Sequence, residues 1–179
     1  MRRSHLRNRL GALAATAVAA IAVTSVLGGC GSESEKGTSV RDVPFSASDG
    51  ESASVADFLG TPLVLNMWAT WCQPCVREMP AFDQVAGQLD TVAIIGVNIF
   101  DTPDDAQAFA ADLGVTYPQF TDPNGELSTA LNVTGYPATA FFDADGKLLE
   151  LHQGELSADE LRSSIQRLFA EAAAEGTNP

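Results

Sequence analysis

Two cysteines three residues apart are the side chains of this sequence best suited to chemistry. Cys72 and Cys75 lie in the run Trp-Cys-Gln-Pro-Cys, directly after an apolar, strand-like stretch over residues 63–69 and at the start of a helical pattern. Two thiols at this separation can close a disulfide, and the amides at the start of a helix stabilise a thiolate. The spacing therefore predicts thiol–disulfide exchange.

The first thirty residues carry the pattern of an export signal. Residues 1–9 contain four arginines and no acid, residues 10–27 are almost wholly apolar or small, and Gly28, Gly29 and Cys30 follow. A basic start, an apolar stretch and a small-residue exit are typical of a signal peptide. A cysteine directly after small residues resembles the bacterial lipobox, so we expect cleavage before Cys30 and lipid attachment to it. The alternatives are an uncleaved membrane-anchor helix and cleavage of an ordinary secretory signal peptide without lipid attachment.

The net charge of the chain and its expected compartment exclude some partners and indicate the redox state of the cysteines. The chain has 10 basic and 23 acidic residues, and loss of the four arginines with the signal leaves six basic residues and a net charge of −17. Such a surface repels polyanions, so we exclude nucleic acid as a partner. An exported protein meets oxidising conditions, in which a disulfide persists. Because a bridge between Cys72 and Cys75 closes a very short loop, it adds little stability, and a purely structural role explains it poorly.

The composition divides the chain into four parts. Residues 1–29 are the expected signal peptide, and residues 30–42 are the lipidated Cys30 with a flexible tether rich in Gly, Ser and Glu. Residues 43–175 have the size of one domain with its own core, and residues 176–179 are expected to be a disordered tail.

Periodicity and capping residues give a coarse order of elements. We expect edge strands near residues 43–46 and 52, a helical turn over 55–59, strands over 63–69 and 91–98, a helix over 72–89 kinked at Pro80, a helix starting at Thr102, a short strand over 117–121, a short helix over 127–131, a hairpin over 138–152 around Asp145-Gly146, and a helix starting at Ser157. Parallel strands joined by crossover helices predict an α/β layered fold, with the hairpin adding antiparallel edge strands.

This order, the Trp-Cys-x-x-Cys run and a distant Gly-Tyr-Pro resemble the thioredoxin fold. The sequence is most similar to the exported, membrane-tethered TlpA/ResA/DsbE-like thiol–disulfide oxidoreductases, over about residues 43–170. Residues 66–80 and 135–143 carry the resemblance, together with Asp145-Gly146. It implies a thioredoxin fold with a central mixed β-sheet flanked by helices, an N-terminal β extension and a helical insertion.

The expected site is built around the cysteine pair. Cys72, at the start of the helix, is the expected nucleophile, and Cys75, one turn further on, is the expected resolving thiol. Gln73 and Pro74 lie between them and tune the stability of the thiolate. Trp71 is expected to form an apolar docking surface for substrate.

The resemblance adds a second part to the site. It implies that Pro137 follows a cis peptide bond and faces the cysteine pair, so that the backbone of Tyr136 can pair with an extended substrate.

One acidic residue has two interpretations. Glu78 lies three residues after Cys75 on the same side of the helix, where it is either a solvated surface acid or, as the resemblance implies, an acid near the site. In the second case it takes the proton of Cys75 or contacts substrate. Asn66 stands where cytoplasmic thioredoxins carry a buried aspartate, so that proton-shuttling role is absent or has moved to Glu78.

Together these features predict an extracytoplasmic, lipid-anchored oxidoreductase that needs no metal or organic cofactor. The family includes reductants of protein disulfides in cytochrome c maturation, which a membrane thiol donor of the DsbD/CcdA type must re-reduce. An oxidant or isomerase of exported proteins is the alternative. A thiol peroxidase would need a lone peroxidatic cysteine, and a Sco-like copper carrier would need a longer Cys spacing and a further His. Zinc needs about four N or S ligands, whereas His152 is the only histidine after the signal.

Overall fold

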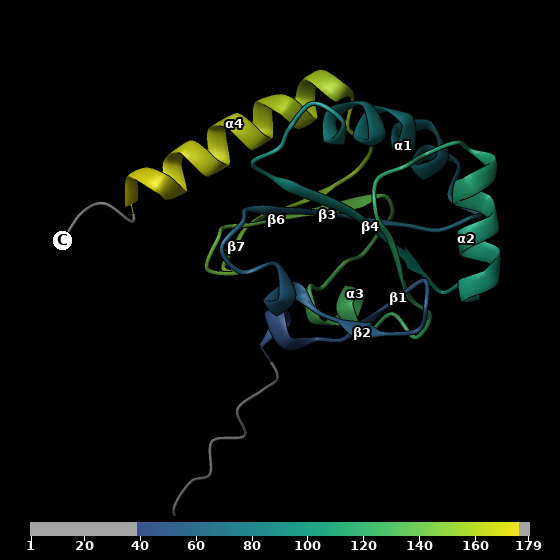
Figure 1. The fold of residues 1–179 in the computed structure, drawn as a ribbon. Coiled ribbons are helices and arrows are strands. Elements are labelled where there is room, and N and C mark those ends of the chain that lie inside the picture. The colour runs from purple at the N-terminus through teal and green to yellow at the C-terminus, as the bar shows by residue number, and fades with distance from the viewer. Residues whose placement is uncertain (1–38, 176–179) are drawn as a thin grey trace, which may run out of the picture. The chain divides into compact units, whose positions relative to one another are not determined.

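The structure is a computed structural model that describes residues 39–175 (Figure 1). The expected signal peptide, Cys30 and residues 31–38 of the tether lie outside the described residues, as does the tail over 176–179. Within the described part, no helix is long and apolar enough to cross a membrane.

The elements follow the predicted order. They are η1 (Val40–Asp42), β1 (Phe45–Ala47), β2 (Ser52–Ala53), η2 (Val55–Phe58), β3 (Leu63–Trp68), α1 (Gln73–Ala86), β4 (Ala93–Ile99), α2 (Pro103–Asp112), β5 (Gln119–Asp122), α3 (Glu126–Ala130), β6 (Ala138–Phe142), β7 (Leu148–Gln153) and α4 (Ala158–Glu175).

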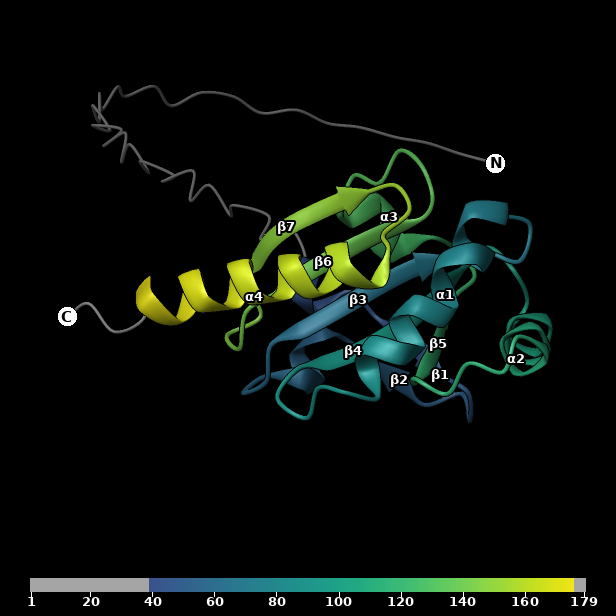
Figure 2. The same cartoon turned by 90° about the horizontal axis from the view of Figure 1, so that it is seen from above.

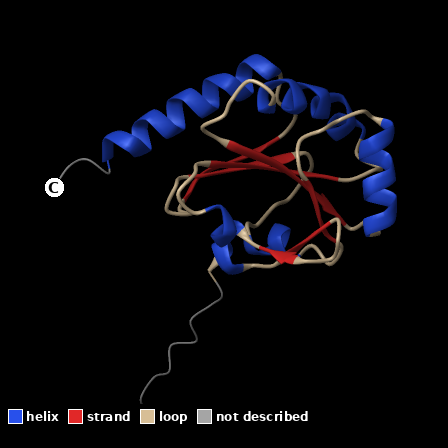
Figure 3. Cartoon of the chain, viewed as in Figure 1, coloured by secondary structure: helices blue, strands red, loops and turns tan. Residues whose placement is uncertain are grey.

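Seven strands form one mixed sheet in the order β2-β1-β5-β4-β3-β6-β7. Figure 3 shows the strands in red, with helices in blue around them. Strands β3, β4 and β5 are parallel, whereas β6 and β7 on one side and β1 and β2 on the other add antiparallel pairs. The expected thioredoxin fold is therefore confirmed. The β1–β2 pair is the N-terminal extension, and the segment between β4 and β6 contains α2, β5 and α3.

Two apolar layers cover the central strands. Helices α1 and α4 lie over one face of the sheet, as Figure 2 shows, and pack Phe82, Val85, Leu161 and Ile165 there. The short elements η1, η2 and α3 lie against the other face, where residues of β3 and β4 meet Leu127 of α3. All six residues of β3 are buried, which is the pattern of a strand covered on both sides.

Two boundaries differ from the prediction. Helix α1 ends at Ala86 with Gly87 as its C-cap, three residues before the predicted end. The folded part also begins before residue 43, since Val40 in η1 packs against the core. A single apolar residue in a polar run gives no periodic signal, which is why the predicted tether is too long at this end.

Candidate active site

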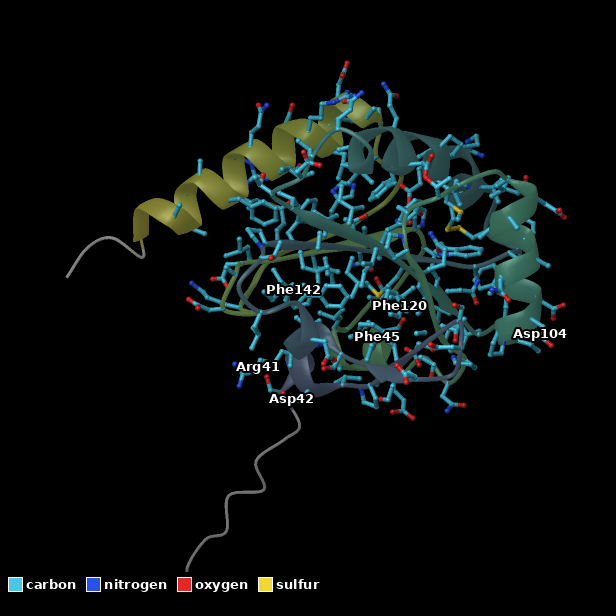
Figure 4. The ribbon with its side chains drawn as sticks, in the orientation of Figure 1. Arg41, Asp42, Phe45, Asp104, Phe120 and Phe142 are labelled. Atoms are coloured by element: carbon cyan, nitrogen blue, oxygen red, sulfur yellow. A yellow bond between two sulfur atoms is a disulfide. The ribbon has the colours of Figure 1, made fainter. Side chains whose placement is uncertain are left out.

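The cysteine pair lies at the start of α1, as the spacing predicts. Cys72 and Cys75 form a disulfide, visible as the yellow bond near α2 in Figure 4. Cys72 is the N-cap residue of α1, and the backbone N–H of Cys75 donates to its Sγ over 3.3 Å. The helix dipole and this amide both favour negative charge on the Cys72 sulfur.

The two sulfurs differ in access. Cys72 is 4% exposed, whereas Cys75 is fully buried among Trp68, Met79 and the small residues of α2. Of the two cysteines, only Cys72 reaches the surface, and only by this small fraction. Between them, Gln73 is exposed and Pro74 occupies the first helical turn, where its missing N–H costs no hydrogen bond.

Tyr136 and Trp71 lie beside the pair, although they come from distant parts of the chain. Trp71 is 59% exposed, and its ring meets that of Tyr136 edge-on with centroids 6.0 Å apart. Tyr136 also packs against the cluster that contains both cysteines, and its hydroxyl donates to Ser128 Oγ over 2.8 Å. The Tyr136–Pro137 peptide bond is cis, as the resemblance implied, and sheet pairing of β6 begins one residue later at Ala138.

Glu78 is buried and hydrogen-bonded, so the interpretation as a surface acid is wrong. Its side chain is 1% exposed; Oε1 accepts from Asn66 Nδ2 over 2.7 Å and Oε2 from the backbone N–H of Leu156 over 2.9 Å. Burial raises the pKa of Glu78 to about 7, although these two hydrogen bonds oppose the rise. Because Cys75 precedes it by three residues on the same buried helix face, the two side chains are neighbours.

Sequence analysis missed Tyr117, which completes this buried network. The Tyr117 hydroxyl donates to Asn66 Oδ1 over 3.2 Å, and burial raises the pKa of the phenol, which therefore stays protonated. With its oxygen engaged by Tyr117, the Asn66 amide presents its NH₂ group to Glu78. The buried face of α1 contains Cys75, Glu78, Met79, Phe82 and Val85. In the sequence, Glu78 occupies the i+3 position of an i, i+3, i+4 series of otherwise apolar residues that starts at Cys75. That spacing could have predicted that Glu78 lies on the buried face of the helix.

Asp101 was also missed, and it anchors the loop before the cysteines. Its carboxylate accepts from the backbone N–H and the hydroxyl of Thr70, over 2.8 and 2.9 Å, and from Asn98 Nδ2 over 2.8 Å. These bonds attach the Thr70–Cys72 loop to the end of β4. In the described part of the chain, no three His, Cys, Asp or Glu side chains group together as a metal site would require.

Comparisons with known proteins agree with this geometry. The model of the AhpC/TSA family matches residues 37–150. The thioredoxin-like protein YneN of Bacillus subtilis is 30% identical over 135 residues, covering 73% of this chain and 79% of YneN. The thiol:disulfide interchange protein DsbE of Vibrio cholerae is 37% identical over 119 residues, covering 66% of this chain and 64% of that protein.

A solved structure adds a likeness in three dimensions. A secreted Mycobacterium tuberculosis disulfide oxidoreductase, described as homologous to DsbE of E. coli, superposes with a TM-score of 0.64 at 26% identity, covering 72% of this chain and 97% of that one. The fold, the Cys72–Cys75 pair and these matches agree with one another. The chain therefore belongs to the AhpC/TSA family of thioredoxin-like proteins, among its thiol–disulfide oxidoreductases.

Proposed function

We propose that this protein is a membrane-anchored extracytoplasmic reductant of disulfides in other exported proteins, of the type that serves cytochrome c maturation. The observation that carries the proposal is the asymmetric pair: Cys72, which reaches the surface at the start of α1, and a fully buried Cys75 behind it. The export signal and Cys30 support the location, as does the secreted relative from Mycobacterium tuberculosis.

In the proposed reaction, Cys72 and Cys75 supply the two sulfurs with which the protein forms and breaks bonds. The Cys72 thiolate attacks a substrate disulfide, forms a mixed disulfide and releases one substrate thiolate, which takes up a proton. The Cys75 thiolate then attacks Cys72 Sγ, so that the Cys72–Cys75 bond forms and the second substrate sulfur leaves. Two electrons pass to the substrate. A membrane thiol donor of the DsbD/CcdA type restores the dithiol by the same two steps.

Glu78 is proposed to accept the proton of Cys75. A thiol as buried as Cys75 resists ionisation, and it must ionise before it can attack. The neighbouring carboxylate is half-ionised near pH 7, so it can take this proton at neutral pH and return it during re-reduction. Gln73 and Pro74 are proposed to tune the thiolate of Cys72, because Pro74 has no N–H and the amide that reaches the sulfur belongs to Cys75.

Trp71, Tyr136 and Pro137 are proposed to bind the substrate segment around its cysteine. Tyr136 lies two residues before Ala138, the first paired residue of β6, and its backbone is proposed to meet an extended chain in the manner of an added strand. The exposed ring of Trp71 provides an apolar surface on the same side of the pair.

The reduction potential of the Cys72/Cys75 couple tests the direction of electron flow. The full-length protein is equilibrated in defined thiol buffers and the fraction of disulfide is measured by mass after alkylation. A value near −270 mV or lower is expected for a reductant. A value of about −120 to −180 mV would replace this proposal with that of an oxidant or isomerase for exported proteins.

A further inference from the structure

Three aromatic side chains, two of them exposed and one half-buried, contact one another next to the cysteine pair. We call Trp71, Tyr136 and Phe100 the aromatic rim. Tyr136 lies in the middle, with its ring centroid 6.0 Å from that of Trp71 and 6.3 Å from that of Phe100, and both contacts are edge-on. Phe100 is 54% exposed and Trp71 59%. These are the two most exposed large hydrophobic side chains of the described residues, and both lie at the site.

The position of Phe100 is costly for the backbone. Its φ is +70°, in the left-handed region that disfavours a bulky side chain. Among the described residues, the other non-glycine residue with a positive φ is Asn132, a type that tolerates this region. A glycine or asparagine would suit the backbone at position 100 better, so the phenylalanine there costs the fold conformational strain. An outlier of this kind beside a reactive site points to function.

The surroundings of Phe100 hold the ring in place. Its backbone N–H donates to the carbonyl of Asp122 over 3.4 Å, and the next residue, Asp101, is bonded to Thr70 in the loop before Cys72. The ring lies so close to Gly125 that any side chain there would overlap it. Phe100 is thus fixed relative to the loop that carries the cysteine pair.

We infer that Phe100 is a substrate-binding residue, which selects extended segments with a large apolar side chain about two residues from the reacting cysteine. The inference rests on the proposed function. Tyr136 packs against the cluster that contains Cys72, so a substrate cysteine joined to Cys72 lies beside Tyr136. An extended chain advances about 3.3 Å per residue, and side chains two positions apart share one face. Two residues therefore span about 6.6 Å, close to the 6.3 Å between the ring centroids of Tyr136 and Phe100. A side chain two residues from the substrate cysteine can then lie against Phe100.

The occupant is a transient substrate because of where the rim lies. Trp71 directly precedes Cys72 and Tyr136 packs against the cluster that contains it, so a permanent partner on the rim would cover the sulfur that must react. The chain is also strongly acidic, with a net charge of −13, so an apolar or basic segment approaches more easily than an acidic one.

The test compares disulfide-linked homodimers of one short peptide that carries either Phe or Ser two residues from its cysteine. The rate constant for reaction with the reduced full-length protein is measured by stopped-flow tryptophan fluorescence. The wild type is expected to react at least fivefold faster with the Phe peptide. Phe100→Ala is expected to reduce this ratio to below two. A third peptide, with Phe five residues from the cysteine, is expected to react like the Ser peptide.

Two variants separate binding from folding. Phe100→Asn removes the ring but suits the left-handed backbone, so it should lose the preference without a lower thermal midpoint. Leu59→Ala truncates another exposed apolar side chain, 48% exposed and outside the rim, and should keep the wild-type ratio. A wild-type ratio in Phe100→Ala, or no preference in the wild type, would overturn the inference.

The reverse exchange distinguishes failure of this inference from failure of the proposed function. The same ratios are measured with the oxidised protein and the thiol forms of the peptides. If the protein oxidises the thiol peptides but does not reduce the disulfide peptides, the reductant proposal is refuted. The ratio of the rates with the Phe and Ser peptides then still tests the role of Phe100. No exchange in either direction would refute both.

Discussion

Replacing Glu78 with Gln is predicted to remove most of the pH dependence of folding stability near neutral pH. Glu78 is buried, and its pKa rises from 4.5 to about 7 in the folded protein. The folded state therefore holds a proton that the unfolded state releases between these two values. The ionisation of Glu78 costs no stability below pH 4.5. The free energy of unfolding falls as the pH rises from 4.5 to about 7, and it stays at its lowest value above pH 7.

The size of the effect follows from the shift of the pKa. A difference of 2.5 pH units between 4.5 and about 7 corresponds to about 3.4 kcal/mol at high pH. Part of the penalty is already present at pH 5, and a small part is still missing at pH 8. Linkage gives a loss of about 2.5 kcal/mol in the free energy of unfolding between pH 5 and pH 8. Glutamine does not titrate, so this loss should vanish in Glu78→Gln.

The assay is denaturant unfolding of the oxidised full-length protein at pH 5, 6, 7 and 8, followed by tryptophan fluorescence. The disulfide keeps both cysteines from titrating. Titration of the other acidic residues is common to wild type and variant, so the difference between the two curves isolates Glu78. Glu171→Gln is the matched control: it makes the same substitution on an exposed position of α4 and should keep the wild-type loss.

Parallel pH profiles in wild type and Glu78→Gln would refute the reasoning. The carboxylate would then be ionised at about the same pH in the folded and unfolded states, and it would be unable to exchange a proton with Cys75 near pH 7. The proton-transfer role proposed for Glu78 would have to be abandoned.

Three further predictions follow from the same region. Cys75→Ser should accumulate mixed disulfides with substrate through Cys72, whereas Cys72→Ser should abolish turnover; mass spectrometry and an insulin reduction assay measure these outcomes, and wild-type turnover in Cys72→Ser would contradict the mechanism. Tyr117→Phe removes the donor that orients Asn66, whose amide can then turn and accept from the protonated acid. A hydrogen bond of about 1 kcal/mol to the protonated form raises the pKa of Glu78 in the folded protein by about 0.7 unit, so the loss of stability should extend about 0.7 unit higher in pH and grow by about 1 kcal/mol in total. An unchanged pH profile would show that Tyr117 does not act on Glu78. Gly96→Ala places a methyl group where the Gln119 side chain lies and should break the hydrogen bond between Gln119 and Trp68 Nε1. In denaturant unfolding, we expect this to lower the free energy of unfolding by about 1–3 kcal/mol. The same substitution in a Gln119→Ala background should cost much less, and equal costs in both backgrounds would refute this packing argument.

The sequence determined the local features, because their causes lie within a few residues. The apolar run over residues 91–98 predicted a buried strand, which the structure forms as β4. Thr102 followed by Pro103 predicted the start of α2, where the Thr102 hydroxyl accepts from the N–H of Asp105. The Asp145-Gly146 pair predicted the turn between β6 and β7, in which Gly146 has a φ of +76°. The cysteine spacing at a strand–helix junction predicted the redox pair in the same way.

The environment of those cysteines depends on contacts between distant parts of the chain. Burial raises the pKa of Glu78, whose partners Asn66 and Leu156 come from β3 and from the loop before α4. Tyr117 acts on Glu78 through Asn66, which lies 51 residues before Tyr117 in the chain. The aromatic rim joins the ends of three separate elements at Trp71, Phe100 and Tyr136. Propensity and periodicity report on neighbours along the chain. Which side chains meet across the sheet depends instead on strand order, register and helix packing, and these arise only when the whole domain has folded.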